Sequence, residues 1–298
     1  MAGVVSFSGR EGTEDRPVPK PDGSKSGGPG PLVVIGGAED RDGGILRSFV
    51  TLAGGRDAVV AILATASDEP EGAEEAYVEA FGRLGVRRVL TLRVAERGDA
   101  GRADILRQAE QASGFFFTGG DQLRITSTIG GTALDALLHR KLGLGVVIAG
   151  TSAGASAMSE TMIVAGDDDD APKNCTIKMA PGMGFLKGTV VDQHFAQRGR
   201  IGRLLTALAQ NPSVLGLGVD EDTAAVVFPD RTLRVLGSQT VTVLDGRTIA
   251  ETNATESLPD EPLALTDVVL HVLPSGYGFD LKSRRPLRLS RREMESLP

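Results

Sequence analysis

The sequence predicts an α/β protein with a doubly wound, mainly parallel sheet that is flanked by helices. Short apolar runs, rich in β-branched or aromatic residues and bounded by Gly or Ser, alternate with segments whose apolar residues recur at helical spacing. Strand, helix, strand repetition needs crossover connections, which set neighbouring strands parallel and cover both faces of the sheet with helices. The first half of the chain therefore predicts the fold class.

The predicted elements follow one another in order from residue 31. Five runs predict strands: "PLVVIGG" from residue 31, "AVVAILATAS" from 58, "RVLTLRV" from 88, "GFFFTGG" from 114 and "GVVIAGTSAG" from 145. Helical spacing predicts helices over residues 74–84, 103–112 and 122–138. In an open parallel sheet ligands bind beyond the carboxyl ends of the strands, so the Gly-rich ends of these runs are where a site is expected.

Both ends of the chain differ from this pattern. After about residue 210, strands such as "TLRVLG" and "TVTVLDG" follow one another without long helices, and Pro229-Asp230 and Asp245-Gly246 are turn signals. They predict antiparallel hairpins near the C-terminus, which either close the sheet or add a small second layer. Residues 1–30 are rich in Gly, Pro, Ser and charge and predict a flexible tail. Residues 31–298 are then a single catalytic α/β domain.

Composition restricts the partners and the compartment. The net charge is −7 without a dense Lys/Arg block, which disfavours nucleic acid and anionic membranes as partners. The single cysteine, Cys175, favours a reducing compartment. Three histidines, none at ligand spacing, disfavour a metal site. With no secretory signal and no apolar run of about 18 residues, a cytoplasmic location without a membrane partner is predicted.

The stretch "VVIAGTSAGASAMSE", residues 146–160, contains the candidate nucleophile. Gly150-Thr151-Ser152-Ala153-Gly154 is a G-x-S-x-G motif between a predicted strand and helix-compatible residues. In a nucleophile elbow this motif places the serine on a tight turn with its hydroxyl thrust out of the sheet. Ser152 would also lie at a helix N-terminus, where free amides can stabilise an oxyanion. The alternative is one more serine in a glycine-rich loop.

A serine nucleophile needs a base, and His194 is the best placed of the three histidines. It lies in "TVVDQHFAQRGRIGRLL", where Asp192, Gln193, Arg198 and Arg200 crowd around it. The alternative is a surface loop that leads into a helix over residues 201–209. The other two histidines are better explained as a helix-end surface residue and a sheet residue.

Candidates for the acid and for the oxyanion donors also lie at strand ends. Glu221 ends an apolar strand and could orient the imidazole, although a solvated acidic turn is the alternative. The run "DDDD", residues 167–170, predicts a mobile acidic loop because its charges repel one another. Amides of "GGDQ", residues 119–122, could supply an oxyanion donor beside the Ala153 amide; a helix N-cap by Asp121 or a phosphate cradle are the alternatives.

Taken together, these segments resemble the cyanophycinase family, with peptidase E as a more distant relative. Five motifs carry the resemblance in the family's order: "GGAED" from residue 36, "TGGDQ" from 118, "GTSAGA" from 150, "DQHF" from 192 with Arg198 and Arg200, and "GVDED" from 218. The resemblance implies a class I glutamine-amidotransferase-like fold, a homodimer and no cofactor.

The resemblance further implies a serine peptidase that acts on cyanophycin, a polyaspartate with arginine on its side-chain carboxylates, and releases β-Asp-Arg dipeptides. It implies Ser152 as nucleophile, His194 as base, Glu221 as orienting acid, and amides of Gly120 and Ala153 as the oxyanion hole. The residues it implies for substrate binding are Gln122, Asp192, Gln193, Arg198 and Arg200. The alternatives are a peptidase E-like aspartyl dipeptidase and a non-catalytic amidotransferase-like binding protein.

Overall fold

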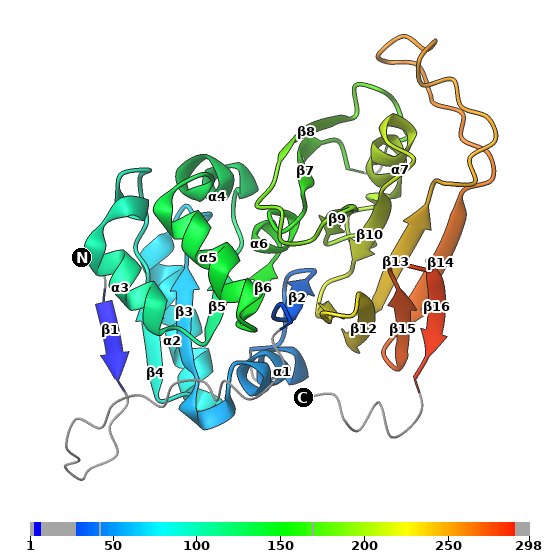
Figure 1. Cartoon of the computed structure of the whole chain (residues 1–298). Coiled ribbons are helices and arrows are strands. Elements are labelled where there is room, and N and C mark those ends of the chain that lie inside the picture. Colours follow the sequence, from blue (N-terminus) through cyan, green and yellow to red (C-terminus); the bar gives the residue numbers. More distant parts are fainter. Residues whose placement is uncertain (1–2, 7–27, 42, 169, 290–298) are drawn as a thin grey trace.

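The computed structural model describes residues 3–6, 28–41, 43–168 and 170–289 (Figure 1). Its centre is a ten-stranded sheet in the order β1-β4-β3-β5-β6-β2-β11-β12-β15-β16. The strands that pair in parallel in it are β4 (Arg88–Thr91), β3 (Val59–Leu63), β5 (Gly114–Phe117), β6 (Val147–Thr151) and β2 (Leu32–Ile35). These are the predicted runs, so the α/β class with a parallel core is confirmed.

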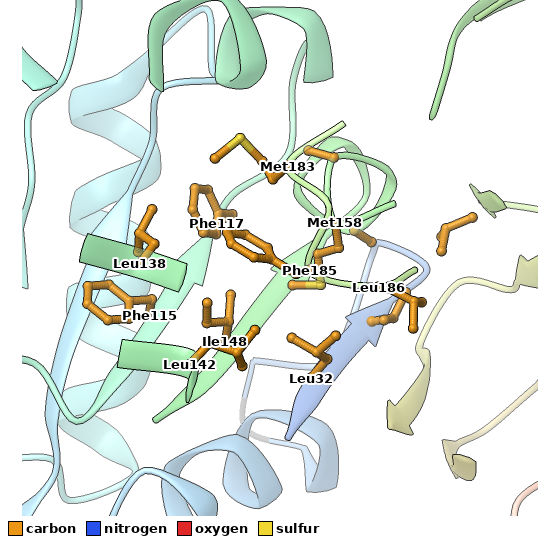
Figure 2. Packing of buried hydrophobic residues seen from close by; sticks show 14 of the residues in the cluster. Leu32, Phe115, Phe117, Leu138, Leu142, Ile148, Met158, Met183, Phe185 and Leu186 are labelled. Atoms are coloured by element: carbon orange, nitrogen blue, oxygen red, sulfur yellow. The ribbon is translucent and has the colours of Figure 1, made fainter. Parts of the chain in front are cut away.

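Helices cover both faces of the parallel strands, because residues along each strand alternate between two cores. In β5, Phe116 points to the core formed with α1 (Gly44–Leu52) and α2 (Pro70–Arg83). Phe115 and Phe117 point to the opposite core (Figure 2), which includes side chains of α3 (Ala103–Gln111), α4 (Gln122–Ile129) and α5 (Ala133–Gly143). Short 3-10 turns at Gly55–Asp57 and Asp99–Gly101 precede β3 and α3.

An aromatic cluster fixes α2 against the sheet. The ring centroid of Phe116 lies 4.6 Å from Tyr77 and 5.3 Å from Phe81, both on α2, and 5.6 Å from Phe49 on α1. Such aromatic contacts add stabilisation beyond the area that they bury. The rigid packing matters for function because the hydroxyl of Tyr77 reaches the loop after β2.

The helix predicted over residues 122–138 is two helices, so that prediction was wrong about its continuity. The break falls at Gly130 and Gly131, and Gly131 has a φ of +70°, which does not fit a right-handed helix. Thr132 then caps α5, its hydroxyl accepting a hydrogen bond from the Asp135 amide. The other predicted helices differ from α2 and α3 only at their ends.

The second half of the chain builds a second sheet, in the order β14-β13-β10-β9, next to the first (Figure 1). Its strands are β9 (Thr189–Gln193), β10 (Leu215–Val219), β13 (Thr240–Asp245) and β14 (Val269–Pro274), and α7 (Ile201–Gln210) packs on it. β10 and β11 (Thr223–Val227), although adjacent in sequence, belong to different sheets. The turn between them, residues 220–222, therefore crosses from one sheet to the other.

The predicted antiparallel hairpins are present and serve both purposes foreseen for them. β11 extends the large sheet antiparallel to β2, followed by β12 (Thr232–Gly237), β15 (Tyr277–Asp280) and β16 (Arg285–Arg288). β13 and β14 form part of the second sheet. A separate pair, β7 (Thr161–Gly166) and β8 (Ile177–Pro181), follows the short helix α6 (Ala153–Ser156).

The N-terminal segment differs in part from the predicted tail. Residues 3–6 form β1 (Gly3–Ser6), which pairs antiparallel with β4 at the edge of the large sheet. The rest of the predicted tail, apart from residues 28–30, lies outside the described residues. Among the described helices, none is both long enough and apolar enough to cross a membrane.

Candidate active site

The candidate site lies where β2, β6, β9 and β10 end, at the junction of the two sheets. Three consecutive carbonyls, at the end of β2 and just after it, hold the other three strand ends in place. Each of these carbonyls accepts a hydrogen bond from a backbone amide that follows one of those strands. These bonds run from Ser152 N to Ile35 O (3.0 Å), from His194 N to Gly36 O (2.9 Å) and from Asp222 N to Gly37 O (2.9 Å). Residues more than 100 positions apart are thereby fixed around one short segment.

Ser152 lies on a strained turn between β6 and α6. Its φ of 52° and ψ of −113° are outside the regions that side-chain-bearing residues normally occupy. The turn is tight enough that a Cβ on Gly150 would overlap the Gly154 carbonyl, and a Cβ on Gly154 would overlap the Phe117 carbonyl. The glycines of the motif are therefore required by close backbone approach, as in a nucleophile elbow.

Ser152, His194 and Glu221 form a continuous hydrogen-bonded chain. The Oγ of Ser152 lies 3.0 Å from Nε2 of His194, and Nδ1 of His194 lies 2.6 Å from Oε1 of Glu221. His194 itself has a φ of +47°, and its ring packs over Gly37, where a Cβ would overlap it. These distances are those of a nucleophile, a base within reach of its proton and a carboxylate that orients the base.

A second acid, Asp220, fixes the loop that carries Glu221. One oxygen of Asp220 accepts from the Ala196 amide (3.0 Å), and the other from the hydroxyl of Thr240 (2.7 Å). The amide of Glu221 itself donates to Gln197 Oε1 (3.0 Å). Through Asp220 the loop after β9 is joined to the loop after β10, so His194 and Glu221 are held in one mutual position.

The loop after β5 supplies backbone amides next to Ser152. Gly119 packs against Ser152, and Gly120 has a φ of +135° and lies so close to the Ala66 carbonyl that a Cβ would overlap it. Among the described residues no hydrogen bond to the amides of Gly120 or Ala153 is found. These amides are therefore available for an oxyanion. Asp121 also caps α4, because its carboxylate accepts a hydrogen bond from the Leu123 amide (2.8 Å). The helix N-cap that was an alternative for this segment is therefore present as well.

The residues predicted to bind substrate lie in different environments. Oε1 of Gln193 is 3.4 Å from the Ser152 hydroxyl, which places it at the site. Gln122 is buried, and its Nε2 donates to the carbonyl of Ile163 (2.6 Å). Arg198 is exposed on the loop that follows His194. Arg198 is thus reachable by a substrate, whereas Gln193 lies beside Ser152 but is only 6% exposed, and Gln122 has its amide committed to the protein.

Asp192 and Arg200 are buried and paired within the protein, which does not fit the direct contact with a substrate that was predicted for them. Asp192 has no exposed surface and accepts two hydrogen bonds from Arg203, at 2.6 and 2.7 Å. Arg200 is only 6% exposed and donates to Gln193 O (2.8 Å) and Asp168 Oδ1 (2.7 Å). The crowding of charges around His194 in the sequence therefore reflects an internal ion-pair network, in which the oppositely charged groups satisfy one another.

Asp168, within the run predicted to be a mobile acidic loop, belongs to this network. Burial raises the pKa of its carboxyl, but the hydrogen bond from Arg200 and the nearby charges of Arg200 and Arg203 outweigh burial, so the pKa is lowered. Asp170 pairs with Lys173 at 2.9 Å. Two of the three described acids of the run, Asp168 and Asp170, have basic partners, which offsets part of the mutual repulsion that the sequence suggested.

Comparison with known proteins places this geometry in a family. The model of peptidase family S51 matches residues 32–236, which include every residue of the Ser152, His194, Glu221 chain. The chain belongs to peptidase family S51. It is accordingly a serine-type peptidase with an α/β fold.

Members of family S51 that resemble this chain include proteins named cyanophycinase. One from Synechococcus elongatus is 39% identical over 272 residues, covering 90% of this chain and 84% of the relative. Another, from Geminocystis herdmanii, is 39% identical over 259 residues, covering 86% and 95%. A solved peptidase structure from an acI-B1 actinobacterium has a TM-score of 0.63 at 21% identity, covers 85% of this chain and 97% of its own, and supports the fold.

Glu39, in the "GGAED" stretch, supports the turn that carries Ser152, a role that the sequence did not reveal. Glu39 is 8% exposed and accepts hydrogen bonds from the hydroxyls of Thr151 (2.6 Å) and Tyr77. Thr151 precedes Ser152, so this buried carboxylate links the elbow to α2. Burial raises the pKa of Tyr77, and the neighbouring charge of Glu39 raises it further. The Tyr77 hydroxyl therefore stays protonated and acts as a hydrogen-bond donor. In the sequence, only the motif "GGAED" drew attention to Glu39.

Replacing Glu221 with glutamine should lower kcat by about 10²- to 10⁴-fold and leave KM nearly unchanged. Glutamine keeps the shape of the side chain but removes the charge that stabilises the imidazolium. Steady-state kinetics would measure both constants, with Glu256→Gln in the exposed 246–268 segment as the matched control. A mainly KM effect would instead assign Glu221 to substrate contact.

Proposed function

We propose that this chain is a cyanophycinase, which hydrolyses the polyaspartate backbone of cyanophycin and releases β-Asp-Arg dipeptides. The observation that carries the proposal is the chain of hydrogen bonds from Ser152 through His194 to Glu221 in a chain 39% identical to proteins named cyanophycinase. Oε1 of Gln193 lies 3.4 Å from the same hydroxyl, and Gly119, which precedes Gly120, packs against Ser152.

The proposed reaction proceeds through an acyl-enzyme. His194 Nε2 takes the proton of Ser152 as Oγ attacks the scissile backbone carbonyl, and the amides of Gly120 and Ala153 stabilise the oxyanion that forms. His194 then gives this proton to the leaving amine as the C–N bond breaks. A water molecule, deprotonated by His194, attacks the acyl-enzyme and restores the Ser152 hydroxyl.

Exposed basic residues near Ser152 suit a substrate with repeating carboxylates. A small cavity of about 170 Å³ adjoins Ser152 and is lined in part by Arg41, whose guanidinium lies 5.2 Å from the centre of the Tyr77 ring. Arg198 lies on the loop after His194. Guanidinium groups bind carboxylates with paired hydrogen bonds. Arg41 therefore joins Arg198 as a candidate for substrate binding, in place of the buried Asp192 and Arg200.

Incubation of the purified protein with insoluble cyanophycin tests the proposal. The suspension should clear, and mass spectrometry should find β-Asp-Arg as the main product, while the Ser152→Ala variant should leave the polymer intact. An intact polymer with the unmodified chain would reject the substrate. The cytoplasmic location and the homodimer remain predictions, and gel filtration of the same preparation would test the second.

The two alternatives give other outcomes in the same set of assays. An aspartyl dipeptidase would cleave short α-Asp peptides and leave the polymer untouched. A non-catalytic binding protein would cleave neither and would fail to react with a fluorophosphonate at Ser152. The strained turn and the 3.0 Å distance between Ser152 Oγ and His194 Nε2 favour a reactive serine over that last alternative.

A further inference from the structure

A second and larger cavity, of about 470 Å³, opens at the carboxyl ends of β3 and β4. Its volume falls within the roughly 300–1,000 Å³ of typical ligand pockets. The side chains that line it come from the segments after these two strands, from α2 and from α4, and Ser152 is not among them. The loop after β3 separates this cavity from the loop after β5 that carries Gly120, here called the oxyanion loop. Ala66 of the β3 loop packs against Gly120, and Ser67 lines the cavity.

The cavity carries charges of both signs. Its lining includes the carboxylates of Asp68, Glu71 and Glu74 and the guanidiniums of Arg93 and Arg124. Arg124 pairs with Asp68 at 2.7 Å, and Arg93 pairs with Glu74 at 2.9 Å. The two arginine side chains are 48% and 41% exposed. The Arg124–Asp68 pair is exposed on both sides and therefore weak, so a ligand that brings its own charges can exchange partners with it.

The inner part of the cavity has unused hydrogen-bonding capacity. Glu74 is 4% exposed, and among the described residues only its Oε2 has a hydrogen-bond partner, Arg93. Thr65 Oγ1 is buried and has no partner within the described part of the chain. Burial raises the pKa of Glu74 in spite of the opposing effect of Arg93, so one guanidinium does not fully compensate this buried carboxylate.

We propose that this cavity is a second binding site for a β-aspartyl-arginine unit of the polymer, remote from the bond being cleaved. The arginine side chain of the unit would bind Glu74 Oε1 and Thr65 Oγ1 in the inner part. Its carboxylate would bind the guanidiniums of Arg93 and Arg124. The inference rests on the proposed function, and it adds that long substrates are held at two places at once.

Two holding points change how affinity depends on substrate length. Once one unit occupies the active site, binding of a second unit of the same chain is intramolecular, so a long polymer binds more tightly than a short one. Because the loop containing Ala66 and Ser67 lies between the cavity and Gly120, a unit held there also lies close to the oxyanion loop.

The test compares substrates of two lengths in three variants of the full chain. Glu74→Gln removes the inner charge, Thr128→Trp fills the cavity from α4 and keeps all four charged groups of the two ion pairs, and Glu79→Gln on the exposed side of α2 is the matched control. For long polymer, KM should rise about ten-fold in the first two variants and stay unchanged in the control. For a two-unit substrate, kcat and KM should stay at the values of the unmodified chain.

A direct binding measurement separates this inference from the proposed function. In the Ser152→Ala chain, calorimetric titration with free β-Asp-Arg should find a site that Glu74→Gln and Thr128→Trp each abolish. Polymer hydrolysis with unchanged KM in both variants, and unchanged dipeptide binding, would overturn the second site and leave the proposed function standing. If the polymer stays intact but a dipeptide site disappears in both variants, the proposed function fails and the cavity is a site for the free dipeptide.

Discussion

Replacement of Ser152 by alanine should lower kcat for polymer hydrolysis by about 10⁴-fold or more, the scale seen when a nucleophile of a serine triad is removed. The fold should be unchanged, because alanine and serine tolerate the φ of 52° at this position equally poorly and, among the described residues, the hydroxyl forms hydrogen bonds only with Gln193 and His194. Release of β-Asp-Arg, followed by mass spectrometry, measures the loss, and urea unfolding checks the stability.

A double variant sharpens this prediction. Ser152 and His194 act as one unit, so Ser152→Ala combined with His194→Ala should be no slower than Ser152→Ala alone. Ser127→Ala, on the exposed side of α4, is the control and should behave as the unmodified chain. If the two losses multiplied, or if Ser152→Ala kept most of its activity, a nucleophile elsewhere in the chain would be required.

The sequence predicted the parallel core well, and it predicted that Ser152, His194 and Glu221 lie at strand ends, because both features depend on local signals. Runs such as "GFFFTGG" are short, apolar and bounded by glycine, and each became a strand with residues alternating between two cores. Ser152, His194 and Glu221 lie just after the ends of β6, β9 and β10. Ends of neighbouring parallel strands meet at one edge of a sheet, which brings His194 close to Glu221, whereas Ser152 reaches them because the two sheets meet there.

What the sequence could not predict depends on contacts between distant segments or on a competition between local tendencies. The assignment of β10 and β11 to different sheets follows from how β9 and β2 pair, and no residue of the intervening turn signals it. Helical spacing continued across Gly130 and Gly131, but the preference of Gly131 for a positive φ prevailed. Arg203 was missed as the partner of Asp192 because it lies on α7, outside the segment that resembled a pocket.

Asp192→Ala should destabilise the fold by about 3–5 kcal/mol, since it leaves the buried guanidinium of Arg203 without its partner. Arg203 is 5% exposed and makes both of its shortest hydrogen bonds to Asp192, while Arg200 lies 3.6 Å from the same carboxylate. Urea unfolding would measure the loss. Asp170→Ala is the matched control, because its ion pair with Lys173 is partly exposed and lies outside the contacts of Arg203, so the urea unfolding should hardly change.

The same variant distinguishes a supporting role of Asp192 from direct contact with the substrate. An internal ion pair predicts that Asp192→Ala, assayed at a temperature where it is folded, keeps its KM and loses kcat, because Gln193 and His194 follow directly on β9. The double variant Asp192→Leu with Arg203→Met, which replaces the pair by apolar side chains, should recover most of the stability. A raised KM with unchanged stability would return Asp192 to the substrate pocket. Its complete burial and paired hydrogen bonds to Arg203 argue for the first result, so specificity for the charged polymer has to come from exposed residues such as Arg41 and Arg198.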